Sequence, residues 1–343
     1  GGLPALGDSI VSVEGLMGAP QGPPVDTILR VNQHEGPFMK IQDAIRAAKV
    51  GDKILVAPGR YQETIRIDRP VEIMGDGHVT DVIVESSGKD TLVFETDFGV
   101  IARITLRQRG TGFWNCIDCV AGQLNLEGCD VSSQSLTCIS VHKKEARPRI
   151  WRNRIHDCGG VGIYVYDSAS ATIEDNDIYN NGQSGIEISE GANPEISFNR
   201  IRDNSQHGVL VHDNGKGELR DNEIFKNNLA GIEVRESGNP KIVRNKIYQH
   251  ESSGGIYIHH YGRAMIEKND IYRNSLSGVT VWKSGKPICK QNRISRNGEY
   301  GIHVKDGGWG TFEENDVRSN GRGGLLVTLE SQLKVVQERN LID

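Results

Sequence analysis

The 343-residue chain has little of the chemistry that marks several common protein classes. Proline is scarce (11 residues), no apolar run approaches the length of a membrane span, and no block of basic residues is present. The formal net charge of −5 argues against binding of nucleic acid through phosphate contacts. No charged and then apolar leader is visible, so we predict a cytoplasmic location; removal of a leader would instead imply a secreted or periplasmic protein.

Cysteine is also sparse, and its six residues are dispersed. Cys116 and Cys119 form a C-x-x-C pair, but a zinc site would have to recruit Cys129 and Cys138, whose spacing is irregular. We therefore predict buried structural thiols, with no metal and no cofactor. Free buried cysteines would fit a reducing compartment.

In contrast, glycine is abundant (41 residues), and one motif recurs with a fixed period. An Asn-x-Ile or Asn-x-Val triplet repeats every 23 residues, with one spacing of 24, at Asn153, Asn176, Asn199, Asn222, Asn245, Asn269, Asn292 and Asn315. Cys129 occupies the same position one coil earlier, and Asn340 continues the series. A period of this length is typical of a solenoid whose repeats pack only on their neighbours.

Each repeat holds three short strands separated by turns. The first is the Asn-x-Ile segment, and the second follows a glycine, as in Gly208-Val209. The third places one apolar residue three positions before the next Asn, such as Ile242. Strands this short form sheets only by stacking. We therefore predict an all-β fold, a right-handed parallel β-helix with coils of about 23 residues.

The two ends of the chain depart from the repeat. Residues 1–36 are rich in Gly and Pro and read as a flexible tail or linker. The β-helix domain is expected over 37–343, with a cap and first coils over 37–78 that include a short capping helix at 41–48. We expect a C-terminal cap over 326–343.

In-register stacking predicts ladders of like residues about 4.8 Å apart. The repeated Asn forms one ladder. A second lies five residues on, at Asn181, Asn204, Asn227, Asn274, Asn297 and Asn320, and His250 interrupts it. The residue after each first-ladder Asn alternates in charge from Arg154 to Asp316, which predicts stacked ion pairs. Most of the acidic residues therefore belong to the scaffold.

Functional residues are expected on the outward positions of the second strand, because this face does not repeat. It mixes aromatic, imidazole and charged groups, which suits an extended ligand. The candidate ligand-binding residues are Tyr164, Tyr166, Glu187, His212, Glu233, Arg235, Tyr257, His259, Trp282, His303 and Lys305. An ordinary variable solvent face is the alternative interpretation.

An enzyme would place its chemistry on the same face. His259 or Tyr257 would serve as base, Arg235 would neutralise a uronate carboxylate, and Glu233 would act as acid or metal ligand. Glu187 and Glu233 lie two coils apart, roughly 9–10 Å, which is too far for one shared ion but similar to an inverting glycosidase pair.

Three segments carry a family resemblance: 238–248, 254–259 and 262–272. With them, roughly residues 40–340 resemble the CASH-type β-helix of F-box-only substrate receptors, whose β-helix is a binding surface. No F-box pattern is visible, so recruitment of a ubiquitin ligase does not carry over. The repeat is also similar to NosD-like periplasmic proteins, pectate lyases and alginate epimerases, so it indicates fold far more than function.

We predict a non-catalytic β-helix interaction or scaffold domain that binds a protein partner along the second-strand face. The alternative is a carbohydrate-active enzyme, a polysaccharide lyase, epimerase or hydrolase, that acts on an extended glycan there. A third possibility is a rigid structural subunit without a ligand groove.

Overall fold

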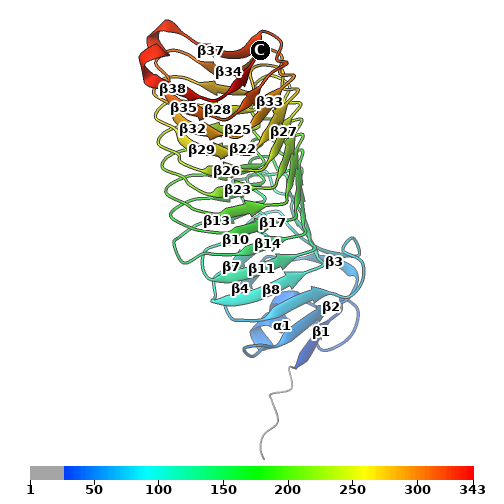
Figure 1. The fold of residues 1–343 in the computed structure, drawn as a ribbon. Coiled ribbons are helices and arrows are strands. Elements are labelled where there is room, and N and C mark those ends of the chain that lie inside the picture. Colours follow the sequence, from blue (N-terminus) through cyan, green and yellow to red (C-terminus); the bar gives the residue numbers. More distant parts are fainter. Residues whose placement is uncertain (1–26) are drawn as a thin grey trace, which may run out of the picture.

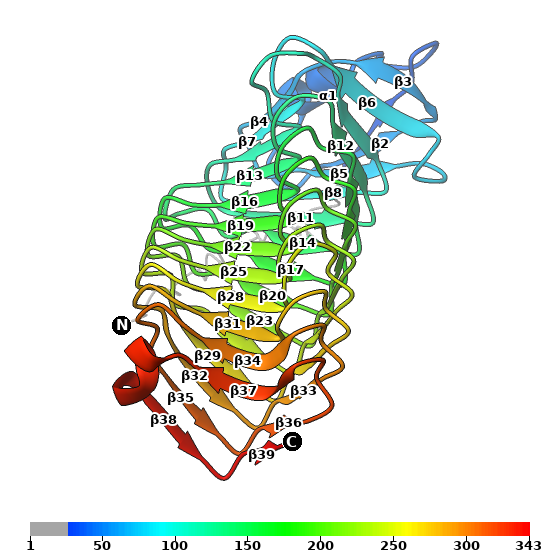
Figure 2. The same cartoon turned by 90° about the horizontal axis from the view of Figure 1, so that it is seen from above.

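The computed structural model describes residues 27–343, which wind into one parallel β-helix (Figure 1). Coils stack along one axis, with a short helix at one end and a 3₁₀ helix at the other, as Figures 1 and 2 show. The helix is right-handed and its coils average about 23 residues, which confirms the predicted fold. Within the described part of the chain, no helix is long and apolar enough to cross a membrane.

Three parallel sheets run the length of the molecule, and each complete coil contributes one strand to each, while the coils at the two ends contribute to fewer. Sheet A has 14 strands: β1 (Ile28–Val31), β2 (Lys53–Val56), β5 (Glu72–Gly75), β8 (Phe98–Ala102), β11 (Gln123–Glu127), β14 (Arg149–Trp151), β17 (Thr172–Glu174), β20 (Glu195–Ser197), β23 (Glu218–Arg220), β26 (Lys241–Val243), β29 (Arg263–Glu267), β32 (Lys286–Lys290), β35 (Gly310–Glu313) and β38 (Val335–Glu338).

Sheet B has 13 strands: β3 (Gly59–Gln62), β6 (Val82–Ser86), β9 (Thr105–Gln108), β12 (Asp130–Ser133), β15 (Arg154–His156), β18 (Asp177–Tyr179), β21 (Arg200–Arg202), β24 (Glu223–Phe225), β27 (Lys246–Tyr248), β30 (Asp270–Tyr272), β33 (Arg293–Ser295), β36 (Asp316–Val317) and β39 (Leu341–Ile342). Sheet C has 12: β4 (Ile65–Ile67), β7 (Leu92–Phe94), β10 (Ile117–Cys119), β13 (Ile139–Val141), β16 (Ile163–Val165), β19 (Ile186–Ile188), β22 (Val209–Val211), β25 (Ile232–Val234), β28 (Ile256–Ile258), β31 (Val279–Val281), β34 (Tyr300–Val304) and β37 (Gly323–Val327).

The first Asn ladder closes the bend between sheets A and B. In a typical rung, the main-chain N–H and Nδ2 of Asn222 both donate to Oδ1 of Asn245 at 3.0 Å. Nδ2 of Asn222 also donates to the carbonyl of Ile196 at 2.9 Å. These bonds satisfy polar groups that the buried bend would otherwise leave unpaired.

In the coils that carry the second ladder, the glycine at the start of the sheet C strand makes room for the ladder side chain. A side-chain carbon added at Gly208 would lie 2.9 Å from Nδ2 of Asn227 and 2.6 Å from the carbonyl oxygen of Gly231. The same geometry recurs at Gly185 against Asn204. Glycine and ladder Asn are therefore matched partners in successive coils.

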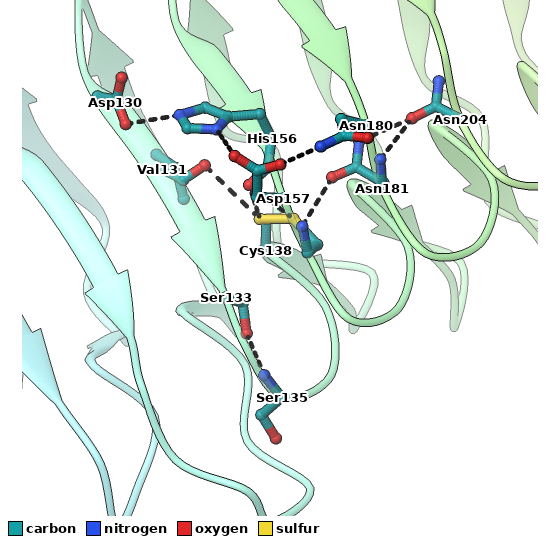
Figure 3. The surroundings of a disulfide bond; sticks show 11 residues. Asp130, Val131, Ser133, Ser135, Cys138, His156, Asp157, Asn180, Asn181 and Asn204 are labelled. Atoms are coloured by element: carbon teal, nitrogen blue, oxygen red, sulfur yellow. Dashed lines mark hydrogen bonds and ion pairs between the residues drawn. A yellow bond between two sulfur atoms is a disulfide. The ribbon is translucent and has the colours of Figure 1, made fainter.

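The thiol prediction is wrong for two cysteines, because Cys138 and Cys158 form a disulfide with a Cα–Cα distance of 5.6 Å (Figure 3). Cys138 stands at the glycine position, since its neighbour Ile139 pairs with Ile163. Cys158 stands at the ladder position, and its N–H donates to Oδ1 of Asn181 at 3.1 Å. The disulfide replaces a glycine–asparagine contact. The other four cysteines are free and buried.

The charge ladder stacks in the predicted register, as in the pairing of Arg200 with Glu223. Some rungs form direct ion pairs, including Arg200 with Glu223 at 3.7 Å and Arg293 with Asp270 at 2.5 Å. Asp177 instead accepts from Arg202, which reaches back from the next coil. The strand register therefore stacks residues of alternating charge. The long arginine side chains reach several nearby carboxylates and do not always pair with the one in register.

The ends differ in detail from the expected boundaries. Helix α1 (Ile41–Ala47) buries Ile41, Ala44 and Ile45 against the first coils, as a cap should. Residues 28–31 form β1 in sheet A, so the β-helix begins before residue 37, and residues 1–26 of the expected tail lie outside the described part. At the other end, η1 (Leu329–Lys334) precedes β38 and β39, which extend sheets A and B.

Candidate functional site

The candidate residues lie in two columns along sheet C, the surface we call the sheet C face. The first column is in strand register, and its consecutive members are Tyr164, Glu187, Leu210, Glu233, Tyr257, Thr280 and His303. The second column directly follows the strands and contains Tyr166, Ser189, His212, Arg235, His259, Trp282 and Lys305. Each of its main-chain N–H groups donates to the preceding coil, as His259 does to Val234 at 3.0 Å.

Glu233 forms the centre of the face. Its carboxylate contacts two imidazoles, accepting from Nε2 of His259 at 2.5 Å and pairing with Nε2 of His207. Burial alone would raise the pKa of Glu233, but the hydrogen bonds and charges of His207 and His259 outweigh it and lower the pKa. The carboxylate is therefore held ionised although the residue is only 8% exposed.

Aromatic rings surround this carboxylate. The rings of His259 and Trp282 stack at 5.4 Å, and Tyr257 lies 4.9 Å from His259. His260 meets Trp282 edge-on and also contacts His259. We call His207, Glu233, Tyr257, His259, His260 and Trp282 the Glu233 cluster. Burial, and then Glu233, raise the pKa of Tyr257 to about 12.

Two further groups occupy the face nearer the N-terminus. Nε2 of His212 bonds Oε1 of Glu187 at 2.7 Å, and this bond raises the pKa of His212. The rings of Tyr164 and Tyr166 stack at 4.4 Å, and the Tyr164 hydroxyl bonds Ser189 at 2.8 Å. The two groups and the Glu233 cluster follow one another along the same line.

His303 and Lys305 lie further along the columns. The His303 ring packs 5.2 Å from Tyr300. Burial, and then the nearby Lys305 charge, lower the pKa of His303. His303 and Lys305 share the face with the Glu233 cluster, but within residues 27–343 their side chains form no hydrogen bond, ion pair or ring contact with it.

Sequence reasoning missed His207 and His260. His207 precedes Gly208 in the corner rather than on the strand, and His260 follows the second column at φ +44°. Only the stacking of two adjacent coils brings His207 to a carboxylate 26 residues away. A search for imidazoles near the Glu233 column, regardless of strand position, would have found both.

Three nitrogen atoms beside the cluster lack partners. Nε of Arg235, Nε1 of Trp282 and Nδ1 of His207 are buried and form no hydrogen bond within the described residues. Arg235 also has no ion pair there, while Glu187 and Glu233 are both engaged by imidazoles. Within the described residues, Arg235 and Trp282 therefore each keep an unused N–H donor, and the guanidinium of Arg235 has no ion pair.

The geometry disfavours the general-acid role for Glu233. An acid of this kind needs a raised pKa, whereas two imidazoles lower the pKa of Glu233. His259 is similarly committed, because its two ring nitrogens contact Glu233 and His260.

Known proteins resemble this chain chiefly in fold. An F-box protein of Arabidopsis thaliana, SKIP5, is 29% identical over 109 residues, which cover 31% of this chain and 39% of that protein. The mannuronan C-5 epimerase AlgE6 A-module of Azotobacter vinelandii superposes with a TM-score of 0.57 at 15% identity, over 88% of this chain and 92% of that one.

A variant of the periplasmic alginate epimerase AlgG superposes with a TM-score of 0.62 at 14% identity, over 92% of this chain and 83% of that one. The catalytic domain of a GH87 α-1,3-glucanase gives 0.59 at 12%, over 94% and 70%. At such identities these likenesses show the fold alone. The family model described as a right handed beta helix region matches residues 114–247 and 195–339, so the chain belongs to the right-handed β-helix family.

Proposed function

We propose that the chain is a non-catalytic binding domain that holds an extended segment of a partner protein along the sheet C face. The observation that carries the proposal is a pair of N–H donors, Nε of Arg235 and Nε1 of Trp282, that are buried and have no hydrogen-bond partner within residues 27–343. An unpaired buried donor costs about 1–3 kcal/mol. An extended peptide offers carbonyl and carboxylate oxygens along its whole length.

Charge and ring geometry favour an acidic segment. Within residues 27–343 the guanidinium of Arg235 pairs with no carboxylate, and Lys283 lies over the Trp282 ring at 4.2 Å. The rings of Tyr257 and Trp282 are inclined by only 26° at 5.9 Å, so they present nearly parallel aromatic surfaces. Aromatic anchors flanked by a cation are typical of protein-binding hot spots. The likeness to an F-box protein supports a binding role.

A polysaccharide-processing reaction is the second candidate. It is favoured by the proximity of Tyr257, His259 and Arg235, and the similar solved structures are named as epimerases and a glucanase. The engagement of Glu233 and His259 with each other counts against it. An anionic glycan would use the same unpartnered donors.

The test is selection of a displayed peptide library on the immobilised domain. We expect enriched acidic peptides whose affinity falls about tenfold or more in Arg235→Gln/Trp282→Phe, because two hydrogen bonds are lost while the ring remains. The matched control is Arg149→Gln/Trp151→Phe, which makes the same two replacements on sheet A, where Arg149 lies over the Trp151 ring at 4.3 Å.

Peptides that bind the sheet C double variant as tightly as the parent would overturn the proposal. The second candidate is tested on alginate and polygalacturonate. Binding that depends on Arg235 and Trp282, or rising ultraviolet absorbance from unsaturated uronides, would establish it instead.

A further inference from the structure

A cavity of about 640 Å³ lies away from the sheet C face, at the corner between sheets B and C in the first coils. Successive corners after β3, β6 and β9 build it. Its lining residues are Gln62, Glu63, Thr64, Glu85, Ser86, Ser87, Gly88, Lys89 and Arg109. The volume falls within the range of small-molecule sites.

Glu85 is the unusual residue in this lining. Its side chain is only 7% exposed, and it lies 3.5 Å from Nη1 of Arg60 and 3.9 Å from Nη1 of Arg109. The Oε2 atom is buried and has no hydrogen-bond partner in the part of the chain that the structure describes. Arg109, whose side chain is 46% exposed, covers this oxygen without a hydrogen bond. Oε2 of Glu85 is therefore a buried acceptor, and the partly exposed Arg109 side chain that covers it can turn outward.

The surrounding charges leave an excess of one positive charge. Lys89 and Arg109 line the cavity together with Glu63 and Glu85, and Arg60 adds a third cation 3.5 Å from Glu85. Glu63 is already engaged, since it accepts from the main-chain N–H groups of Ile41 and Gln42 at 2.8 and 3.0 Å. The exposed Lys89 side chain has no ion pair within residues 27–343, so an anionic group can bind here without displacing one.

We infer that this cavity binds a sugar-sized polyhydroxylated acid, with one hydroxyl on Glu85 and its carboxylate between Arg109 and Lys89. Turning of Arg109 toward the carboxylate uncovers Oε2 of Glu85, which then accepts from the hydroxyl. A hydroxyl fits this oxygen better than an ammonium group because Arg60, 3.5 Å from Glu85, already balances its charge. Thr64, Ser86 and Ser87 supply further hydroxyl partners at the walls.

Three probes separate the two halves of this recognition by titration in ¹H–¹⁵N NMR spectra. Glucuronate carries hydroxyls and a carboxylate, glucose only hydroxyls, and acetate only a carboxylate. We expect saturable shifts at residues 62–64, 85–89 and 109 with glucuronate, and affinities at least about tenfold weaker for glucose and acetate.

Variants assign the two contacts. Glu85→Gln should weaken glucuronate about tenfold, since a charged acceptor is lost. Lys89→Gln should remove most of the preference over glucose, and its exposed position keeps folding out of the result. Lys216→Gln, an exposed lysine on a distant coil, is the matched control and should change nothing. Equal binding of glucuronate and acetate, or no saturable shift at these residues, would overturn the inference.

Discussion

His250 is the residue that departs most clearly from the pattern around it. It stands in the second ladder, fully buried, where its Nδ1 accepts from the N–H of Asn227 at 3.2 Å. Its Nε2 is buried without a partner in the described chain. Burial lowers the pKa of His250 to about 3, so the folded protein holds it neutral. A neutral imidazole can replace the amide oxygen as acceptor of a main-chain N–H, so the main-chain bonds of the ladder pass through His250 although the amide-to-amide bonds stop there.

The same burial predicts acid sensitivity. As the pH falls below 6.5, the ordinary pKa of histidine, His250 becomes protonated in the unfolded chain. In the folded chain it becomes protonated only near its lowered pKa of about 3. The free energy of unfolding should therefore fall with decreasing pH across this window. Between about pH 7 and about pH 5, the parent should lose about 2 kcal/mol more than His250→Asn.

Urea unfolding at the two pH values measures this difference. The exposed His78→Asn is the control and should follow the parent. Equal pH dependence in His250→Asn and the parent would show that His250 is not the group responsible.

At the level of the element, two positions of the coil corner depend on each other. They are the residue at the start of the sheet C strand and the ladder residue of the next coil. Glycine at the start of a sheet C strand leaves space for the ladder side chain of the next coil, as Gly162 does for Asn181, whose Nδ2 would lie 2.9 Å from an added carbon. One coil earlier, the same two positions hold Cys138 and Cys158. Two sulfur atoms occupy the space that glycine leaves for an amide.

Because the two solutions occupy equivalent positions, they should be exchangeable. We expect Cys138→Gly/Cys158→Asn to fold with a stability within about 2 kcal/mol of the oxidised parent, since it trades a cross-link for ladder hydrogen bonds. The melting temperature of the double variant should not respond to a thiol reductant, whereas that of the parent should fall.

The single change Cys138→Ala is the comparison for this experiment. It removes the disulfide without supplying a ladder amide, so it should be less stable than the double variant. Equal stability of the two would contradict the matched-pair interpretation.

The ladders and the glycines were predictable because they recur at a fixed spacing. The disulfide was not, because its cysteines lie 20 residues apart and only the coil register shows that they face each other. The aromatic stack of Phe225, Tyr248 and Tyr272 on sheet B, with ring distances of 5.1 and 4.9 Å, was also missed. Only some of the coils carry an aromatic residue at this position.

At the scale of the whole molecule, the two ends of the solenoid are the places where its apolar core could be exposed to solvent. The interior is one continuous column of Ile, Val and Leu side chains, and each coil contacts only its neighbours. Helix α1 covers the N-terminal opening with Ile41, Ala44 and Ile45. The predicted capping helix is thus confirmed, whereas the strand β1 beneath it was missed because it falls in a Gly- and Pro-rich stretch.

Loss of the cap should unfold one end and spare the rest. Ile45→Asp puts a charge where the side chain is 1% exposed, at a cost of about 3–5 kcal/mol. We expect hydrogen exchange to accelerate in the strands before residue 103, with little change over the coils between 153 and 315. Arg46→Asp, on the exposed side of the same helix, is the control.

Uniform acceleration along the whole chain would contradict this prediction. It would mean that the solenoid unfolds as a single cooperative unit rather than coil by coil. Light scattering on the same samples would show whether the uncapped end associates, as an exposed sheet edge tends to do.

The candidate sites show the limit of sequence reasoning at this scale. The non-repeating face was predictable because a structural ladder would have repeated. Glu85 and its cavity were not, since they lie in coils that lack the Asn motif, where sequence alone gives no register.

The first Asn ladder gives the molecule a direction. In every rung the donor belongs to the earlier coil and the acceptor to the next, from Asn153 and Asn176 through Asn315 and Asn340. All the side-chain dipoles therefore point the same way along the axis. Two copies can continue this chain only head to tail, a contact that repeats without closing. Helix α1, which buries Ile41, Ala44 and Ile45 against the first coils, opposes such a contact at the N-terminal end of the helix.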